Sequence, residues 1–486
     1  MIECQASRVY PEDQTMRSST LLLTLSAALA SAAPVLAQNG NGGATDTTAR
    51  PATAPATKAD TTEAKAAAVS LVPRTVIQHI RPQDQRGLHV FETPKEPGVP
   101  FTGFQLSWGA AFTQQFQGLS HENGAVAMTP TGSTANANQL MEIGKGFNNA
   151  AANLYLNAQI AKGMRVALTT YLSSKHHQET WVKDGYFLID ESPIDVDVLN
   201  KIMEVVTLRI GHMEINYGDA HFRRSDNGNA IYNPFVGNLI MDAFTTEVGA
   251  EVYARKAGIL SMVGVSNSEI KGNIQQRTDA GPAIYGKLGF DRQLTDDIRF
   301  RLTGSAYNSK KSPANTLYAG DRAGSRYNLV LENTAATTTA QASSGVINPG
   351  FRYSVTAMQI NPFVKVGGLE FFGVYEKAKG NSKTGTPAAP EAAKREFTQT
   401  AADVIYRLLD DQLYVGYRYN DVTGRLVGMT NDVGSNRSAV AAGWYITPSL
   451  MFKGEYVNQK YNDFPTTDIR HGGKFKGFMV EGVVAW

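Results

Sequence analysis

Apolar and polar residues alternate along most of the chain from residue 103 onward. The last segment shows this most clearly, because Phe478, Val480, Gly482, Val484 and Trp486 occupy every second position. A period of two is the side-chain period of a β-strand with one apolar face. The same alternation recurs in residues 104–113, 153–160, 164–168, 247–252, 298–303 and 413–420. The pattern therefore predicts an all-β fold.

The connections between these segments alternate in length. Short turns are expected at residues 162–163, 255–258, 293–296, 367–368, 409–411 and 447–449. Long polar loops are expected at residues 121–146, 219–245, 271–281, 310–350, 382–395, 424–436 and 462–473. Short turns on one side and long loops on the other are typical of outer-membrane β-barrels.

Counting along these connections predicts a transmembrane antiparallel up-and-down β-barrel of about 16 strands. The count rises to about 18 if Tyr327–Leu331 forms a strand that pairs with another segment of 310–350. A soluble β-sandwich or propeller would show the same alternation. The absence of a blade repeat and the aromatic Trp486 on the last strand favour the membrane barrel, where aromatic residues lie at the interface.

The N-terminal region has the pattern of an exported protein. A short basic stretch at Met16-Arg17 precedes an apolar run, and Val35-Leu36-Ala37 resembles a cleavage signal. We therefore predict a cleaved signal peptide in residues 1–37, with translation starting either at Met1 or at Met16. A start at Met16 would remove Cys4, the only cysteine, and with it any disulfide or thiolate metal site.

The remaining regions follow from composition. Residues 38–72 are rich in Ala, Thr and Pro and are expected to form a disordered linker. Residues 73–102 are expected to be a periplasmic lead-in or a plug of the lumen, and residues 103–486 the barrel. The net charge of +2 without a concentrated basic tract gives no indication of a nucleic-acid partner.

The loop 219–245 differs from the other polar loops. Asn233 followed by Pro234 is a typical helix start, with asparagine as the N-cap and proline in the first turn. Phe235, Val236, Leu239 and Ile240 would then share one helix face. An apolar face in a polar loop suggests that the loop docks against the inner wall of the barrel.

This loop resembles the constriction loop of Gram-negative porins, which folds into the lumen from the third outer position. The matching stretches are Pro234-Phe235-Val236-Gly237 and Asp242-Ala243-Phe244. Together with the strand order, signal peptide and final aromatic, the resemblance covers most of residues 103–486. The chain lacks the acidic residue that follows the proline in that family and instead has Arg223 and Arg224 near Asp226 and Asp242.

The resemblance implies a porin of the outer membrane of a Gram-negative bacterium, with lipid as its surroundings. It also implies assembly by the barrel-assembly machinery through the strand ending at Trp486, and a homotrimer or monomer. The candidate constriction residues are Arg223, Arg224, Asp226, Asn227, Asn233, Asn238 and Asp242. The candidate lumen charges are Arg165, Arg209, Glu247, Glu251, Arg299, Arg301, Arg407 and Arg418.

The predicted function is a water-filled channel for passive diffusion of small hydrophilic solutes and ions. Opposed basic and acidic walls would favour small polar solutes over apolar ones. An anion- or phosphate-selective porin is the first alternative, because the chain is slightly basic and the predicted loop carries arginines. A structural or adhesion protein with a closed lumen is the second.

Enzymatic and cofactor chemistry are not predicted. Ser225 lies close in sequence to His221 and Asp226, but proximity in a loop is not the geometry of a nucleophile and its base. His176 and His177 are adjacent loop residues that we interpret as solvated rather than metal-binding. We therefore expect no enzyme activity, no metal and no cofactor.

Overall fold

The computed structural model describes residues 77, 80–93, 95, 101–148, 150–173, 180–270, 280–312, 314–322, 326–336, 344–385 and 387–486. The predicted signal peptide, the predicted linker, Cys4 and the pair His176-His177 lie outside the described residues.

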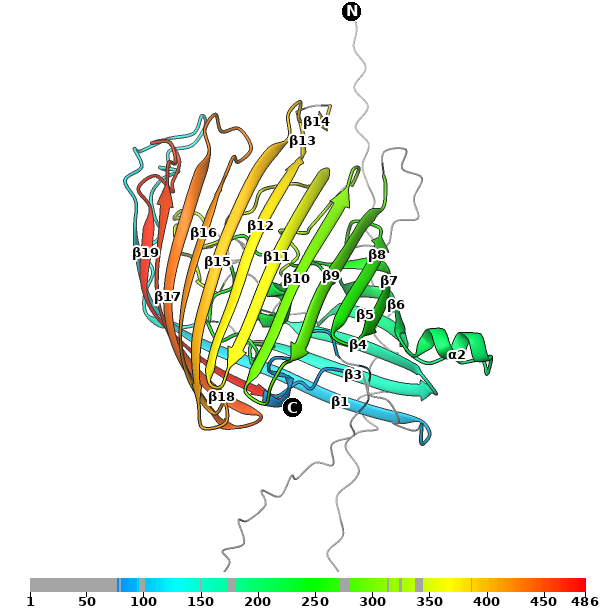
Figure 1. The fold of residues 1–486 in the computed structure, drawn as a ribbon. Helices are drawn as coiled ribbons and strands as arrows, with labels where there is room; N and C mark the ends of the chain where they lie inside the picture. Colours follow the sequence, from blue (N-terminus) through cyan, green and yellow to red (C-terminus); the bar gives the residue numbers. More distant parts are fainter. Residues whose placement is uncertain are drawn as a thin grey trace, which may run out of the picture. The chain divides into compact units, whose positions relative to one another are not determined.

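Sixteen antiparallel strands close into a barrel (Figure 1), as the alternation predicts. The barrel strands are β1 (Gln105–Glu122), β3 (Ala151–Ala161), β4 (Met164–Leu172), β5 (Trp181–Ile189), β6 (Val206–Glu214), β7 (Thr246–Lys256), β8 (Ile259–Ser266), β9 (Ala283–Gln293), β10 (Ile298–Ser309), β11 (Ser354–Val366), β12 (Leu369–Asn381), β15 (Arg395–Leu408), β16 (Leu413–Gly424), β17 (Val433–Thr447), β18 (Leu450–Asn462) and β19 (Lys474–Ala485). Each strand pairs with the next, and β1 closes the ring by pairing with both β3 and β19.

Three short strands complete the list. β2 (Gly146–Phe147) adds to β1, while β13 (Lys383–Thr384) and β14 (Ala389–Pro390) form a separate small hairpin. The described helical elements are the 3₁₀ turns η1 (Gln85–Gly87) and η3 (Ala220–Arg223) and the helix α2 (Asp197–Met203). Helix α2 lies in the long connection between β5 and β6 and projects away from the barrel (Figure 1).

The alternation sorts side chains between two faces, as β16 illustrates. Val415, Tyr417 and Tyr419 are exposed on the outer face, whereas Arg418 and Asn420 are buried on the inner face. The outer face is apolar and the inner face polar, which is the arrangement of a transmembrane barrel. No helix in the described part of the chain is long and apolar enough to cross a membrane.

The alternative of 18 strands is wrong, because residues 327–331 do not form a strand. Tyr327 is buried and donates its hydroxyl to Glu455 on β18 at 2.6 Å. Leu329 and Leu331 have positive φ angles, which a strand does not tolerate. The backbone of this segment is satisfied by side chains of β1, since Asn328 N donates to Gln117 and Leu331 N donates to His121.

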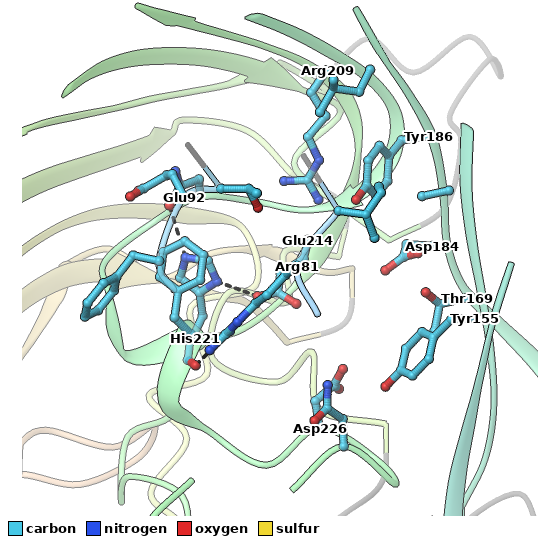
Figure 2. A pocket seen from close by; sticks show the side chains of 18 of the residues that line it. Arg81, Glu92, Tyr155, Thr169, Asp184, Tyr186, Arg209, Glu214, His221 and Asp226 are labelled. Atoms are coloured by element: carbon cyan, nitrogen blue, oxygen red, sulfur yellow. Dashed lines mark hydrogen bonds and ion pairs between the residues drawn. The ribbon is translucent and has the colours of Figure 1, made fainter. Parts of the chain in front are cut away.

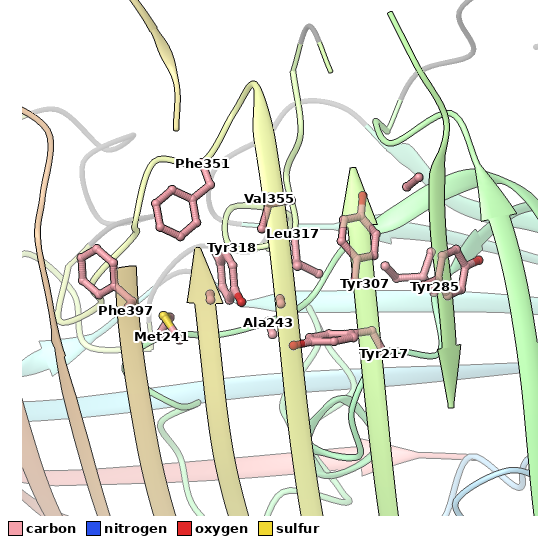
Figure 3. Packing of buried hydrophobic residues seen from close by; sticks show 14 of the residues in the cluster. Tyr217, Met241, Ala243, Tyr285, Tyr307, Leu317, Tyr318, Phe351, Val355 and Phe397 are labelled. Carbon is pink, nitrogen blue, oxygen red and sulfur yellow. The ribbon is translucent and has the colours of Figure 1, made fainter. Parts of the chain in front are cut away.

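An apolar cluster fills part of the lumen between the long connections and the inner faces of β7 to β12, β15 and β16 (Figure 3). Tyr217, Met241 and Ala243 come from the connection 215–245, and Leu317, Tyr318 and Phe351 come from 310–353. The tyrosines in it keep their hydroxyls bonded, as Tyr217 and Tyr318 both donate to Glu376 on β12. The two connections therefore pack on one another inside the barrel.

Candidate functional site: the residual cavity of the lumen

The connection 215–245 between β6 and β7 is held by side chains from the inner face of β15 to β18. Glu455 accepts from the backbone N–H of Val236 and Gly237 at 2.8 and 3.2 Å. On neighbouring strands, Asn420 accepts from Ile240 N and Gln399 accepts from Met241 N. Lys453 donates to three carbonyl oxygens of the same loop, those of Ala230, Asn233 and Phe235.

The predicted helix at Asn233 is wrong, because residues 233–244 contain no helix. Asn233 does accept from Phe235 N at 3.0 Å, but the following N–H groups bond to barrel side chains instead of carbonyl groups one helical turn earlier. Phe235, Val236 and Ile240 are fully buried, so the apolar side chains dock although no helix forms. The only helical turn in this connection, η3, lies earlier, at Ala220–Arg223.

A second segment inside the barrel is residues 80–93, which belongs to the same compact unit as the barrel. Gln85 N donates to the carbonyl of Pro448 in the β17–β18 turn, and His89 O accepts from Arg299 on β10. Phe91 packs edge-on against Phe222 and Phe363. The segment therefore runs along the inner wall at the short-turn end of the barrel.

Glu92 ties this segment to the inner faces of β9 and β10. It lies 2.8 Å from Arg301 and 3.2 Å from Lys287. Although burial alone would raise the pKa of Glu92, these two cations lower it to about 2. Glu92 is therefore ionised at neutral pH and anchors the segment electrostatically.

A cavity of about 230 Å³ remains between these segments and the wall formed by β3 to β7 (Figure 2). The wall contributes Tyr155, Thr169, Asp184, Tyr186 and Arg209, which face the loop and the segment 80–93 across the cavity (Figure 2). The opposite side contributes Arg81, Glu92, His221 and Asp226, and Glu214 lines the cavity from the end of β6. Strands, loop and N-terminal segment thus all line the same space.

Ion pairs crowd the end of the cavity near the long loops. Lys183 bonds to Asp226, lies 3.2 Å from Glu214 and lies 3.9 Å from Asp184. Arg224 lies 2.6 Å from both Asp242 and Asp321, and 3.6 Å from Asp226.

His221 belongs to the same network. Burial lowers the pKa of His221, so its ring is neutral at neutral pH while it bonds to Glu214 and Asn216. The carboxylates at this end therefore gain no positive charge from His221.

The predicted constriction residues separate into two groups. Arg224 and Asp226 line the cavity. Arg223 instead bonds to Glu370 on β12, away from the cavity. The others bond within the connections: Asn227 O accepts from Arg326, Asn233 donates to Ser225, Asn238 donates to the carbonyl of Ser225, and Asp242 accepts from Arg224.

Among the predicted lumen charges, only Arg209 lines the cavity. The rest lie on the inner face in local pairs: Arg165 with Asp190, Glu247 with Ser266 and Tyr307, Glu251 with Tyr253 and Tyr285, Arg299 with Asp291, Arg301 with Asp219, Arg407 with Glu370, and Arg418 with Asp403. Sequence reasoning missed Arg81 and Glu92, because nothing in their neighbourhood shows a period. It also missed Asp184 and Tyr186, although their spacing of two on β5 was a usable signal.

The hydrogen bonds of Ser225 and His221 go to other residues and not to each other. The Ser225 hydroxyl accepts from Asn233 at 3.1 Å, whereas His221 bonds to Glu214 and Asn216. The three residues Ser225, His221 and Asp226 are therefore not arranged as a nucleophile with its base.

Several solved structures of outer-membrane proteins are similar to this chain. No family model and no curated protein matches the sequence. Among solved structures, the anion-selective porin from Comamonas acidovorans is similar at 9% identity over 79% of this chain and 100% of that chain, with a TM-score of 0.46. The outer-membrane channel DcaP of Acinetobacter baumannii is similar at 10% identity over 80% and 99%, with a TM-score of 0.46.

The Salmonella typhi OmpF complex with daunomycin is similar at 12% identity over 79% of this chain and 98% of that chain, with a TM-score of 0.43.

Proposed function

We propose that the protein is an outer-membrane pore through which small hydrophilic solutes and ions diffuse. The observation that supports this most strongly is the polar cavity on the inner face of a closed barrel whose outer face is apolar. Five cationic and four acidic side chains line the cavity: Arg81, Lys183, Arg209, Arg224 and Arg255, and Glu92, Asp184, Glu214 and Asp226. Charges in such near balance favour hydrated polar solutes over apolar ones without a strong preference for one ion sign.

The narrowing would come from two segments. The connection 215–245 occupies the side of the lumen next to β15 to β18, and residues 80–93 occupy the short-turn end, which corresponds to the periplasmic side of such barrels. In this proposal, residues 73–102 act as a partial plug rather than as a free periplasmic arm. Solutes would pass along the wall of β3 to β7.

The experiment is to record currents through the purified protein in planar lipid bilayers, with a salt gradient. Discrete current steps with a reversal potential near zero would support the weakly selective pore. A strongly anion-selective reversal potential would favour the anion- or phosphate-selective alternative. Absence of current from correctly folded protein would refute the pore.

The closed-lumen alternative has one observation in its favour, namely that loops and the N-terminal segment fill much of the interior. Such a protein would offer its outer loops for structural or adhesive contacts. The same bilayer recording separates the two functions, since a closed barrel conducts nothing.

Export and assembly remain part of the proposal. We expect a cleaved signal peptide ending at Ala37, so that N-terminal sequencing of the mature protein starts at Gln38. We also propose insertion by the barrel-assembly machinery and a homotrimer or monomer in the membrane. Chemical cross-linking in membranes followed by mass measurement distinguishes these two assemblies.

A further inference from the structure

The two ends of the cavity carry opposite excesses of charge. At the end near the long loops, Asp184, Glu214 and Asp226 share Lys183. Arg224 does not compensate them fully, because Asp242 and Asp321 hold it at 2.6 Å from the other side. Arg81 also lines this space, but its guanidinium bonds to the carbonyl oxygens of Gly87 and Phe222. The ammonium group of a ligand would balance the excess negative charge at this end.

The other end has the reverse imbalance. Arg209 reaches a carboxylate only through a long contact of 3.4 Å to Glu251. Arg255 bonds to the carbonyl of Thr93, and no carboxylate of the described residues lies within ion-pair distance of it. Nε of both guanidinium groups has no hydrogen-bond partner in the described part of the chain. The carboxylate of a ligand would balance the excess positive charge at this end.

The strand register sets the distance between the ends. Asp184 and Tyr186 are two residues apart on β5 and face the cavity (Figure 2), so they are separated by about 7 Å along the strand. The Arg209 guanidinium lies over the Tyr186 ring at 4.2 Å, hence at the level of Tyr186. A group of two or three atoms with an ammonium at one end and a carboxylate at the other spans this distance with a charge-assisted hydrogen bond of about 2.8 Å at each end.

Unpartnered polar atoms on the same wall are an independent observation. The Tyr155 hydroxyl, one carboxylate oxygen of Asp184 and the Thr207 hydroxyl are buried without a hydrogen-bond partner among the described residues. All three side chains line the cavity and are at least nine-tenths buried. Buried polar groups are normally bonded, so an unbonded set around one cavity points to a ligand that bonds them.

We propose that the cavity binds small zwitterions of the α-amino-acid class. The ammonium group lies among Asp184, Glu214 and Asp226, and the carboxylate lies on Arg209 and Arg255. This inference rests on the proposed pore and names the class of solute that its passage recognises.

The test uses four probes of similar size and different charge: L-alanine, the cation 1-amino-2-propanol, the anion L-lactate and the neutral 1,2-propanediol. Each is titrated into the purified full chain while its KCl current is recorded in a bilayer. L-alanine is expected to reduce the current at about a tenfold lower concentration than the other three, which is the effect of one additional charge-assisted hydrogen bond. Equal half-blocking concentrations for all four probes would overturn the proposal.

Two variants separate the ends. Asp184→Asn should weaken block by L-alanine and by 1-amino-2-propanol but leave L-lactate unchanged. Arg255→Gln should weaken block by L-alanine and by L-lactate but leave 1-amino-2-propanol unchanged. Asp197→Asn and Lys201→Gln on the exposed helix α2 remove the same charges outside the barrel and should change nothing.

The crossed pattern distinguishes binding from general damage. If both cavity variants weaken all probes alike, the residues act on pore structure and the proposed site is wrong. If the protein conducts no KCl, the pore fails, and titration calorimetry of L-alanine into the detergent-solubilised chain then tests the site alone. Absence of heat in that titration would overturn the site as well.

Discussion

The two halves of the lumen use the same kinds of polar side chain for opposite purposes. On the side of β15 to β18, Gln399, Asn420 and Glu455 accept hydrogen bonds from backbone N–H groups of the connection 215–245. On the side of β3 to β7, Tyr155, Asp184 and Thr207 keep atoms without partners. We call these the packed half and the hollow half. Polar residues on an inner wall therefore indicate a passage only where no chain segment has already bonded them.

The largest difference between the halves is expected in stability. Glu455→Leu removes the acceptor of two backbone N–H groups and of the Tyr327 hydroxyl, all buried. Leaving the two backbone N–H donors of Val236 and Gly237 unbonded should lower the free energy of unfolding by about 3 kcal/mol. The matched change in the hollow half, Asp184→Leu, should cost less than about 1 kcal/mol. Urea unfolding in detergent or vesicles measures the free energy of unfolding of both variants. Equal losses of stability would contradict the difference between the packed half and the hollow half.

The next largest effect concerns the segment that borders the hollow half. Arg81→Ala combined with Phe91→Ala removes the stacking on Tyr232 and the contacts with Phe222 and Phe363. The segment should then leave the wall, and the single-channel conductance should rise by about twofold or more, because conductance depends on the narrowest polar section of the channel.

The control for this change is Phe104→Ala, which removes an aromatic ring from the outer face. It should leave conductance unchanged. Conductance that stays constant in the double variant would show that residues 80–93 do not narrow the passage.

A smaller effect should separate two neighbouring arginines. Arg224 lines the cavity, so Arg224→Ala should leave Asp226 and its neighbours undercompensated and shift the reversal potential toward cations severalfold in permeability ratio. Arg223 bonds to Glu370 away from the cavity, so Arg223→Ala should lower stability without moving the reversal potential. Identical shifts from both variants would contradict the position of Arg223 away from the cavity.

The smallest expected effect is a dependence on pH through His89. Burial lowers the pKa of His89 to about 4. The nearby cations Arg407 and Lys365 also lower it, whereas the carboxylates of Glu370 and Asp411 raise it only in part. A released segment would titrate near the ordinary value of about 6.5, so protonation favours release. Seating of residues 80–93 should thus be complete above pH 6.5 and weaken as the pH falls toward 4.

Conductance recorded at pH 7 and pH 4.5 tests this dependence. It should rise modestly on acidification in the natural protein. His89→Gln cannot titrate and should lose this rise, whereas a rise that persists in the variant would assign it to another group.

The sequence predicted the barrel well because alternation reports a local property. Val415, Tyr417 and Tyr419 are outside and Arg418 and Asn420 inside, as their order along β16 requires. The cavity could not be predicted in the same way, because it depends on contacts between distant residues. Arg81 donates to the carbonyl of Phe222, and Glu455 replaces the helical bonds that Asn233-Pro234 would otherwise start.

Accessibility of the two halves to a thiol reagent tests the central claim, that solutes pass through the hollow half. In a Cys4→Ser background, Thr169→Cys places a thiol on the wall of the cavity, and Ser435→Cys places one on the inner face of β17 in the packed half. A charged methanethiosulfonate reagent added to open channels should reduce the current of Thr169→Cys and leave that of Ser435→Cys unchanged. Block of Ser435→Cys with Thr169→Cys unaffected would contradict the account.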